Sequence, residues 1–237
     1  KAQAGINVVH WDLRVAPLPA PQGDQGGGGG GFGGGGTQGP YVLPGQYGVA
    51  LTVDGRESVA NGQGTSRTLT VEGDPDIAIS DADRRVWFET ATELHTLHGR
   101  ANAAADALNQ MNQRMGQIRE ALRDAKEAPA DLRTRVDSVG AALDTLRRRV
   151  VGGGFGGGGG GGAAAIRGRI AQLKGGVMNS TSLPTEVQMR QLGEVRQALP
   201  RAVEAVNALV ARFTPLLEEL SRQGVYPQPP KPIGEER

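Results

Sequence analysis

The chain has 237 residues, with 26 basic and 25 acidic side chains and a formal net charge of +1. No long stretch carries charge of one sign, which excludes the electrostatic footprint of a nucleic-acid partner. The absence of cysteine excludes disulfides, thiolate metal sites and cysteine catalysis. No apolar run approaches the roughly 18 residues of a membrane span, so we expect no transmembrane segment.

Residues 1–76 are predicted to form β-structure. Residues 6–13 are rich in β-branched and aromatic side chains, as strands are. In residues 47–53 the apolar side chains alternate, and Asp54-Gly55 then supplies a hairpin turn that leads to a return strand at 66–71. The positions predicted to share an apolar face are Tyr47, Val49, Leu51, Val53, Leu69 and Val71. Three such strands cannot close a sandwich, so we expect a partner sheet from elsewhere.

A glycine-rich insertion at about 17–44 separates the first two strands. It contains Gly26–Gly31, Phe32 and Gly33–Gly36, a composition with high backbone entropy and few side chains to bury. We therefore expect a flexible, exposed insertion. A phosphate-binding loop is rejected, because Thr37-Gln38-Gly39-Pro40 follows where that motif needs Lys-Ser/Thr and a helix.

From residue 77 to 225 apolar side chains recur at steps of three and four residues, which indicates a bundle of long helices. Ser80, with Asp83 three residues on, predicts the cap of a first helix of about 45 residues. Its apolar seam is Trp87, Ala91, Leu94, Leu97, Ala101, Ala104, Leu108, Met111, Met115, Ile118 and Leu122, and we expect the methionines to be core. A second helix is predicted from Pro129, with a heptad-like seam that requires a partner helix: Leu132, Val136, Val139, Leu143, Leu146 and Val150.

A second glycine tract at 152–162, which contains Phe155 and is predicted to be a loop, precedes the remaining two helices. A short helix at 163–174 is expected to end at Gly175-Gly176. Thr185 and Gln188 have capping-box spacing for the last helix, which Pro200 and Pro215 should kink or divide. Its predicted apolar positions are Val187, Leu192, Val195, Leu199, Val203, Val206, Leu209 or Val210, Phe213, Leu217 and Leu220. Residues 226–237 form a Pro-rich tail that we expect to be extended.

Four stretches together resemble a known family: AGINVVHWDLR, GPYVLPGQYGVALTVDGR, TLTVEGDPD and LKGGVMNSTSLPTEVQMRQLGEV. They are similar to the C-terminal Ig-like module and following helical region of exported bacterial proteins with a sortilin-like BNR-repeat β-propeller, many of which are labelled glycosyl-hydrolase-like or sialidase-like. The Ig-like part also resembles that of flagellar hook-capping proteins. The resemblance implies an α+β fold, in which a partial Ig-like antiparallel β-sandwich (1–76) precedes an antiparallel helical bundle (77–225).

The same resemblance implies further strands before the Trp-Asp strand, a propeller before those, and export to the periplasm, cell surface or medium. Both glycine tracts depart from the family pattern. No catalytic residue is carried over, because the propeller would hold it. The sequence opens at Lys1 without a hydrophobic signal core, so we expect a processed product or a fragment that begins within a domain.

Candidate chemistry in the sequence is sparse. His95 and His98, with Glu89 or Glu93 nearby, are weak metal candidates, but no third ligand is indicated, and partly exposed histidines on a helix face are the expected reading. Trp11 is expected to be a sandwich core residue. Neither a carboxylate pair for glycoside hydrolysis nor a nucleophile elbow occurs. We expect no catalytic site, no resident metal and no cofactor.

The sequence thus predicts a non-catalytic structural or interaction module, the accessory end of a larger exported propeller protein. Its expected partner is protein, either the upstream propeller region or another subunit in a homo- or hetero-oligomer. Two alternatives stay open. One is the accessory end of a sialidase-like glycoside hydrolase, and the other is a subunit of a surface or extracellular assembly that strands from another chain complete.

Overall fold

The computed structural model describes residues 8–19, 36–50, 66–125, 128–152 and 164–225, together with four two-residue strands between residues 52 and 64. Several predicted features lie outside the described residues. These are Leu51, the turn Asp54-Gly55, most of the first glycine tract with Phe32, residues 153–162 of the second tract with Phe155, and the tail at 226–237.

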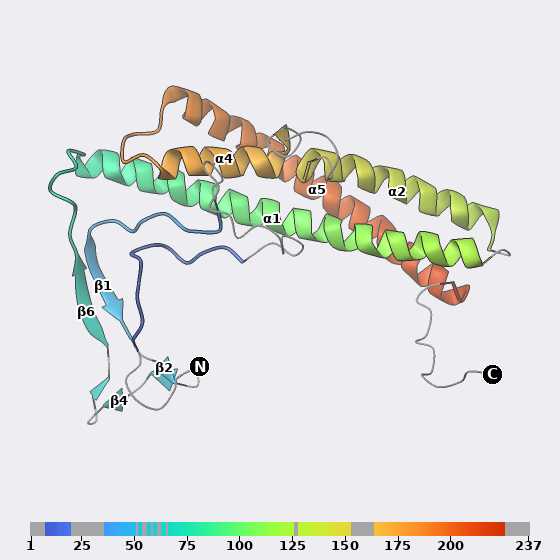
Figure 1. Ribbon diagram of the computed structural model, residues 1–237, viewed down its shortest axis with the longest axis horizontal. Coiled ribbons are helices and arrows are strands. Elements are labelled where there is room, and N and C mark those ends of the chain that lie inside the picture. The colour runs from blue at the N-terminus through green and yellow to red at the C-terminus, as the bar shows by residue number, and fades with distance from the viewer. Residues whose placement is uncertain are drawn as a thin grey trace.

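The fold is α+β and mostly helical, as predicted (Figure 1). The described helices are α1 (Asp81–Asp124), α2 (Ala130–Val150), α4 (Ile166–Met178) and α5 (Glu186–Arg222). The described strands are β1 (Gly45–Val49), β2 (Thr52–Val53), β3 (Arg56–Glu57), β4 (Val59–Ala60), β5 (Gln63–Gly64) and β6 (Arg67–Val71).

The helices pack as an antiparallel bundle. Helix α1 runs the length of the molecule, α2 and α4 lie end to end along it in the opposite direction, and α5 returns across both (Figure 1). All eleven predicted seam positions of α1 are buried, including Met111 and Met115, and together with apolar side chains of the other helices they form one core cluster. The bundle buries an apolar stripe from every described helix, and this burial is the main source of its stability.

Local sequence signals position the long helices. Ser80 caps α1, since its hydroxyl accepts a hydrogen bond from the amide of Asp83 at 3.1 Å. Thr185 and Gln188 cap α5 with a complete capping box, in which each side chain bonds the other residue's backbone amide. Both helix starts were predicted by these residues, and both predictions are confirmed.

Two predictions about helix breakers are wrong in part. Helix α4 continues through Gly175-Gly176 to Met178 because Val177 is buried in the core and its carbonyl accepts a hydrogen bond from the indole of Trp87 at 2.9 Å. This packing outweighs the helix cost of about 1 kcal/mol per glycine. Helix α5 is not divided at either proline, since buried side chains on both sides of each keep the helix in the bundle.

The apolar positions of α2 and α5 follow the predicted seams with small shifts. In α2 only Leu146 is partly rather than fully buried. In α5 the alternative left open is settled in favour of Leu209, because Val210 is 39% exposed. Val187 is exposed rather than buried, Val203 and Leu217 are only partly buried, and Ala202 and Leu216 join the core.

The β-strands form three separate two-stranded antiparallel ribbons: β1 with β6, β2 with β3, and β4 with β5. The predicted return strand at 66–71 is confirmed as β6. The β1–β6 ribbon extends away from the bundle near the start of α1 (Figure 1). Among the described strands no second sheet faces this ribbon, so the sandwich is not formed by this part of the chain.

The predicted strand at 6–13 is wrong where the structure describes it. Residues 8–13 form no strand, and only an isolated bridge joins Arg14 to Tyr41. Leu13 has a left-handed φ of 58°, and a carboxylate oxygen of Asp12 accepts a hydrogen bond from the amide of Arg14 at 3.2 Å. Such local side-chain bonds compete with a strand ladder, and a left-handed residue cannot continue one.

Candidate functional site

The β1–β6 ribbon has one apolar and one polar face. Its register pairs Gly45 with Val71, Tyr47 with Leu69 and Val49 with Arg67, so these alternate residues share a face. The apolar side chains on that face are Tyr47, Val49, Leu69 and Val71, whereas Gln46, Thr68 and Thr70 lie on the other. Val49 is 51% exposed and Leu69 is 42% exposed. The sequence pattern therefore builds a face for burial that the described residues leave half open.

An aromatic group lies beside this face. The ring of Trp11 meets Tyr47 edge-on, with centroids 5.5 Å apart, and its indole N–H donates to the carbonyl of Arg14 at 3.0 Å. The Arg14 guanidinium lies 3.7 Å from the ring centroid of Tyr41. Trp11 is 40% exposed, so its prediction as a core residue is wrong for the described chain. The physical reason is that no second sheet covers it there.

Between ribbon and bundle lies a paired segment that we call the strap, made of residues 13–18 and 36–42. Its two halves are joined by three backbone hydrogen bonds: Val15 N–H to Pro40 O at 2.9 Å, Leu18 N–H to Thr37 O at 2.7 Å, and Val42 N–H to Leu13 O at 2.8 Å. The second half of the strap leads directly into β1. Contacts that hold the strap in place therefore also position the ribbon.

A buried polar cluster lies at the strap's contact with the bundle. It consists of His95, His98 and Asn102 on α1 and Lys174 on α4, all buried. The Lys174 ammonium donates to the carbonyl of Gly36 at 2.8 Å, and Nε2 of His95 is 3.0 Å from the carbonyl of Ala16. Nδ1 of both histidines and the Asn102 amide have no hydrogen-bond partner among the described residues.

The expectation of partly exposed histidines is therefore wrong. His95 and His98 are only 7% and 5% exposed, because α4 and the strap cover the side of α1 on which they lie. The apolar seam of α1 gave no sign of this cover, since the strap comes from a segment about 80 residues away in sequence.

The electrostatics of the cluster disfavour charge. Burial and, to a lesser extent, the positive charge of Arg14 together lower the pKa of Lys174 from an ordinary 10.5 to about 8. Burial, followed by Lys174, Arg167 and His95, lowers the pKa of His98 to about 4. The pKa of His95 is also lowered, by burial and then by Lys174, against the opposing effect of the Ala16 bond. At neutral pH both imidazoles are therefore mainly uncharged, and Nε2 of His95 carries the proton that it donates to Ala16, because a carbonyl oxygen can only accept.

The cluster does not suit a metal ion. The described residues contain no group of three or more His, Asp or Glu side chains placed to hold a metal. A cation would also face the ammonium of Lys174. What this arrangement does chemically is donate hydrogen bonds to backbone carbonyls of the strap.

Sequence reasoning missed Lys174 and Asn102. A signal for Lys174 was present, because it lies four residues after Ile170 and three before Val177, on the buried stripe of α4. A lysine on such a stripe is expected to find an acceptor or to leave the core.

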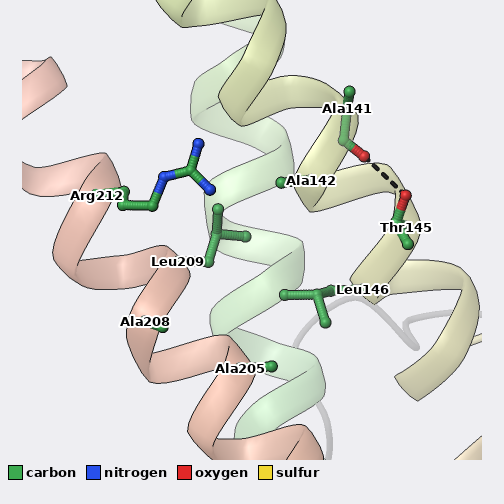
Figure 2. A pocket seen from close by; sticks show the side chains of 8 residues that line it. All are labelled: Ala141, Ala142, Thr145, Leu146, Ala205, Ala208, Leu209 and Arg212. Atoms are coloured by element: carbon green, nitrogen blue, oxygen red, sulfur yellow. Dashed lines mark hydrogen bonds between the residues drawn. The ribbon is translucent and has the colours of Figure 1, made fainter.

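Away from this cluster, a hollow of about 490 Å³ opens between α2 and α5 over α1 (Figure 2). Its lining is dominated by small and apolar side chains: Ala141, Ala142, Thr145, Leu146, Ala205, Ala208, Leu209 and Arg212. The Thr145 hydroxyl donates to the carbonyl of Ala141 at 3.0 Å within its own helix. The guanidinium of Arg212 lies 3.4 Å from the Ser138 hydroxyl. This hollow therefore presents no reactive group.

In comparisons with family models, curated proteins and solved structures, no match to the chain was found. None of the described helices combines the length and the apolarity that crossing a bilayer demands.

Proposed function

We propose that the chain is a non-catalytic structural and interaction module, in which a helical bundle carries a β-ribbon whose apolar face receives a second β-layer. The observation that carries this proposal is the open face of Tyr47, Val49, Leu69 and Val71. An isolated two-stranded ribbon is marginally stable in water, and sheets bury a face of this kind against another layer.

The occupant that we propose is a set of antiparallel strands that precede this chain in the same polypeptide. This choice rests on the resemblance to the exported sortilin-like proteins, whose Ig-like module has strands before the Trp-Asp strand. It is supported by Trp11, since an indole lying edge-on to Tyr47 at 40% exposure extends the apolar surface available to a covering layer. Export from a bacterial cell belongs to the same proposal.

A binding experiment with matched variants tests this proposal. The upstream strands that we propose are expressed as a separate polypeptide and titrated into the 237-residue chain, with binding followed by calorimetry. Leu69→Lys places a charge on the apolar face, while Thr68→Lys places the same charge on the polar face of the same strand. We expect Leu69→Lys to weaken binding by about a hundredfold or more and Thr68→Lys to change it little.

The molar mass of the chain in solution separates the possible occupants. We expect a monomer when the upstream strands are absent. A dimer that Leu69→Lys dissociates and Thr68→Lys leaves intact would contradict the same-polypeptide version and favour the assembly subunit. Equal weakening by both lysine variants, or no binding of the upstream polypeptide, would refute the proposed use of this face.

A further inference from the structure

The strap is held to the bundle by side chains whose burial is energetically costly. Lys174 is fully buried, with 0% exposure, and its ammonium bonds the carbonyl of Gly36. His95, 7% exposed, bonds the carbonyl of Ala16 in the other half of the strap. One side chain from α4 and one from α1 therefore hold opposite halves of a single paired segment.

Packing reinforces these two bonds. Gly39 and Pro40 are buried, and the side chain of Leu18 lies 3.0 Å from where a Cβ on Gly99 of α1 would be. Gly99 thus allows the strap to approach α1 closely because it has no side chain. The Arg14 guanidinium also donates to the carbonyl of Gly39 at 3.0 Å, which stiffens the strap from within.

Lys174 has no evident use for the bundle itself. The other inward positions of α4 are apolar, and an apolar side chain at 174 would avoid the cost of burying a cation. In the described part of the chain its pKa responds to Arg14 and to no carboxylate, so the Gly36 carbonyl is the group that compensates its burial. The side chain therefore serves the strap at the expense of the core.

We propose that Lys174 and His95 form a latch that fastens the strap, and with it the β1–β6 ribbon, to the α1–α4 side of the bundle, and that this latch opens without unfolding the bundle. The proposal is independent of what covers the ribbon. It describes a conformational device in which the ribbon is either held in one position or released on a loosened strap.

The charged and titratable groups around the latch give it a pH dependence. They are Arg14 on the strap, His95 and His98 on α1, and Arg167 on α4. When the latch opens, Lys174 regains its ordinary pKa of 10.5, compared with about 8 when latched, so opening takes up a proton at pH values between the two. Opening therefore becomes roughly tenfold less frequent from pH 7 to pH 9. Over this range the histidines are mainly uncharged in the latched state and at most about a quarter protonated in the open state, where their pKa is the ordinary 6.5, so Lys174 accounts for most of the change.

Hydrogen exchange on the full chain tests the latch through the strap amides of Val15, Leu18 and Val42, which are hydrogen-bonded within the strap. Lys174→Met removes the donor but keeps an apolar stem of similar length. We expect these amides to exchange at least tenfold faster, while amides in the middle of α1 keep their protection. His95→Leu is expected to act in the same direction.

Arg169→Met is the matched control, because it removes a cation from the same helix without touching the strap. Arg169 is paired with Glu194 of α5 at 2.5 Å, and its side chain is 38% exposed. We expect strap exchange in this variant to equal that of the unmodified chain. If the strap amides also exchange faster in Arg169→Met, the effect comes from the loss of a charge on α4 rather than from the bond to Gly36. That result would overturn the latch.

Two other outcomes would also overturn the proposal. If the strap amides exchange at an unchanged rate in Lys174→Met, the bond from Lys174 to Gly36 does not fasten the strap to the bundle. Equal acceleration in the strap and in α1 would show that the strap opens only when the bundle unfolds. The pH dependence adds a separate requirement. After correction for intrinsic exchange, the strap amides of the unmodified chain must exchange roughly tenfold more slowly at pH 9 than at pH 7. This slowing must be absent in Lys174→Met.

Discussion

Acid should destabilise this protein through His98, and the size of the effect follows from its surroundings. His98 is 5% exposed and its pKa is lowered to about 4 from an ordinary 6.5, first by burial and then by Lys174, Arg167 and His95. The unfolded chain therefore binds a proton at this position at a higher pH than the folded chain does. His98 therefore contributes stability above pH 6.5, and this contribution is lost as the pH falls toward 4.

The expected loss is worked from these two pKa values. Relative to pH 7, His98 alone should lower the free energy of unfolding by about 2 kcal/mol at pH 5 and by about 3 kcal/mol at pH 4. His98→Leu removes this contribution. Because Nδ1 of His98 has no hydrogen-bond partner in the described structure, the leucine variant should be as stable as the unmodified chain at pH 7, or more stable.

Denaturant unfolding followed by far-ultraviolet circular dichroism between pH 7 and pH 4 measures both proteins. Carboxylates and His95 titrate in each, so their contributions largely cancel in the difference between the two curves. We expect the curves to diverge by about 2 kcal/mol by pH 5, with the leucine variant the more acid-resistant. Parallel curves would refute the argument that His98 is held neutral by burial and by neighbouring cations.

Three further substitutions test the fold. Leu108→Ala empties a fully buried position of α1 and should cost about 2–5 kcal/mol of unfolding free energy, against less than about 0.5 kcal/mol for Val210→Ala at an exposed position; similar losses would contradict the core assignment. Thr185→Ala removes half of the capping box and should cost about 1 kcal/mol in a denaturant titration, and no loss would show that the cap is dispensable. Gly39→Ala would bring its Cβ against the carbonyl oxygen of Val15, so the Val15 amide should lose its exchange protection while the thermal unfolding of the bundle is unchanged.

The bundle could be predicted from the sequence because its determinants are local or periodic. Ser80 and Thr185 cap helices through residues three positions away, and the α1 seam repeats at helical spacing over its whole length. These signals act within a few turns of chain. They failed at Gly175-Gly176, where burial of Val177 in the core overrides the local preference of glycine.

The candidate site could not be predicted in the same way, since its contacts join distant segments. The bond from Lys174 to Gly36 spans 138 residues, and the bond from His95 to Ala16 spans 79. Periodicity indicates which side of a helix is buried but not what buries it. Trp11 shows the converse case, because a side chain suited to a core is exposed when the described chain supplies no layer above it.

The most direct test of the account measures whether the ribbon's apolar face is covered. The chain has no cysteine, so Leu69→Cys and Thr68→Cys each introduce a single thiol, on the apolar and the polar face respectively. Maleimide labelling is timed in the 237-residue chain and in the same chain extended by the upstream strands that we propose. We predict that extension slows labelling of the Leu69→Cys variant at least tenfold and leaves the Thr68→Cys variant unchanged. Equal labelling rates of the Leu69→Cys variant in both proteins would contradict the account.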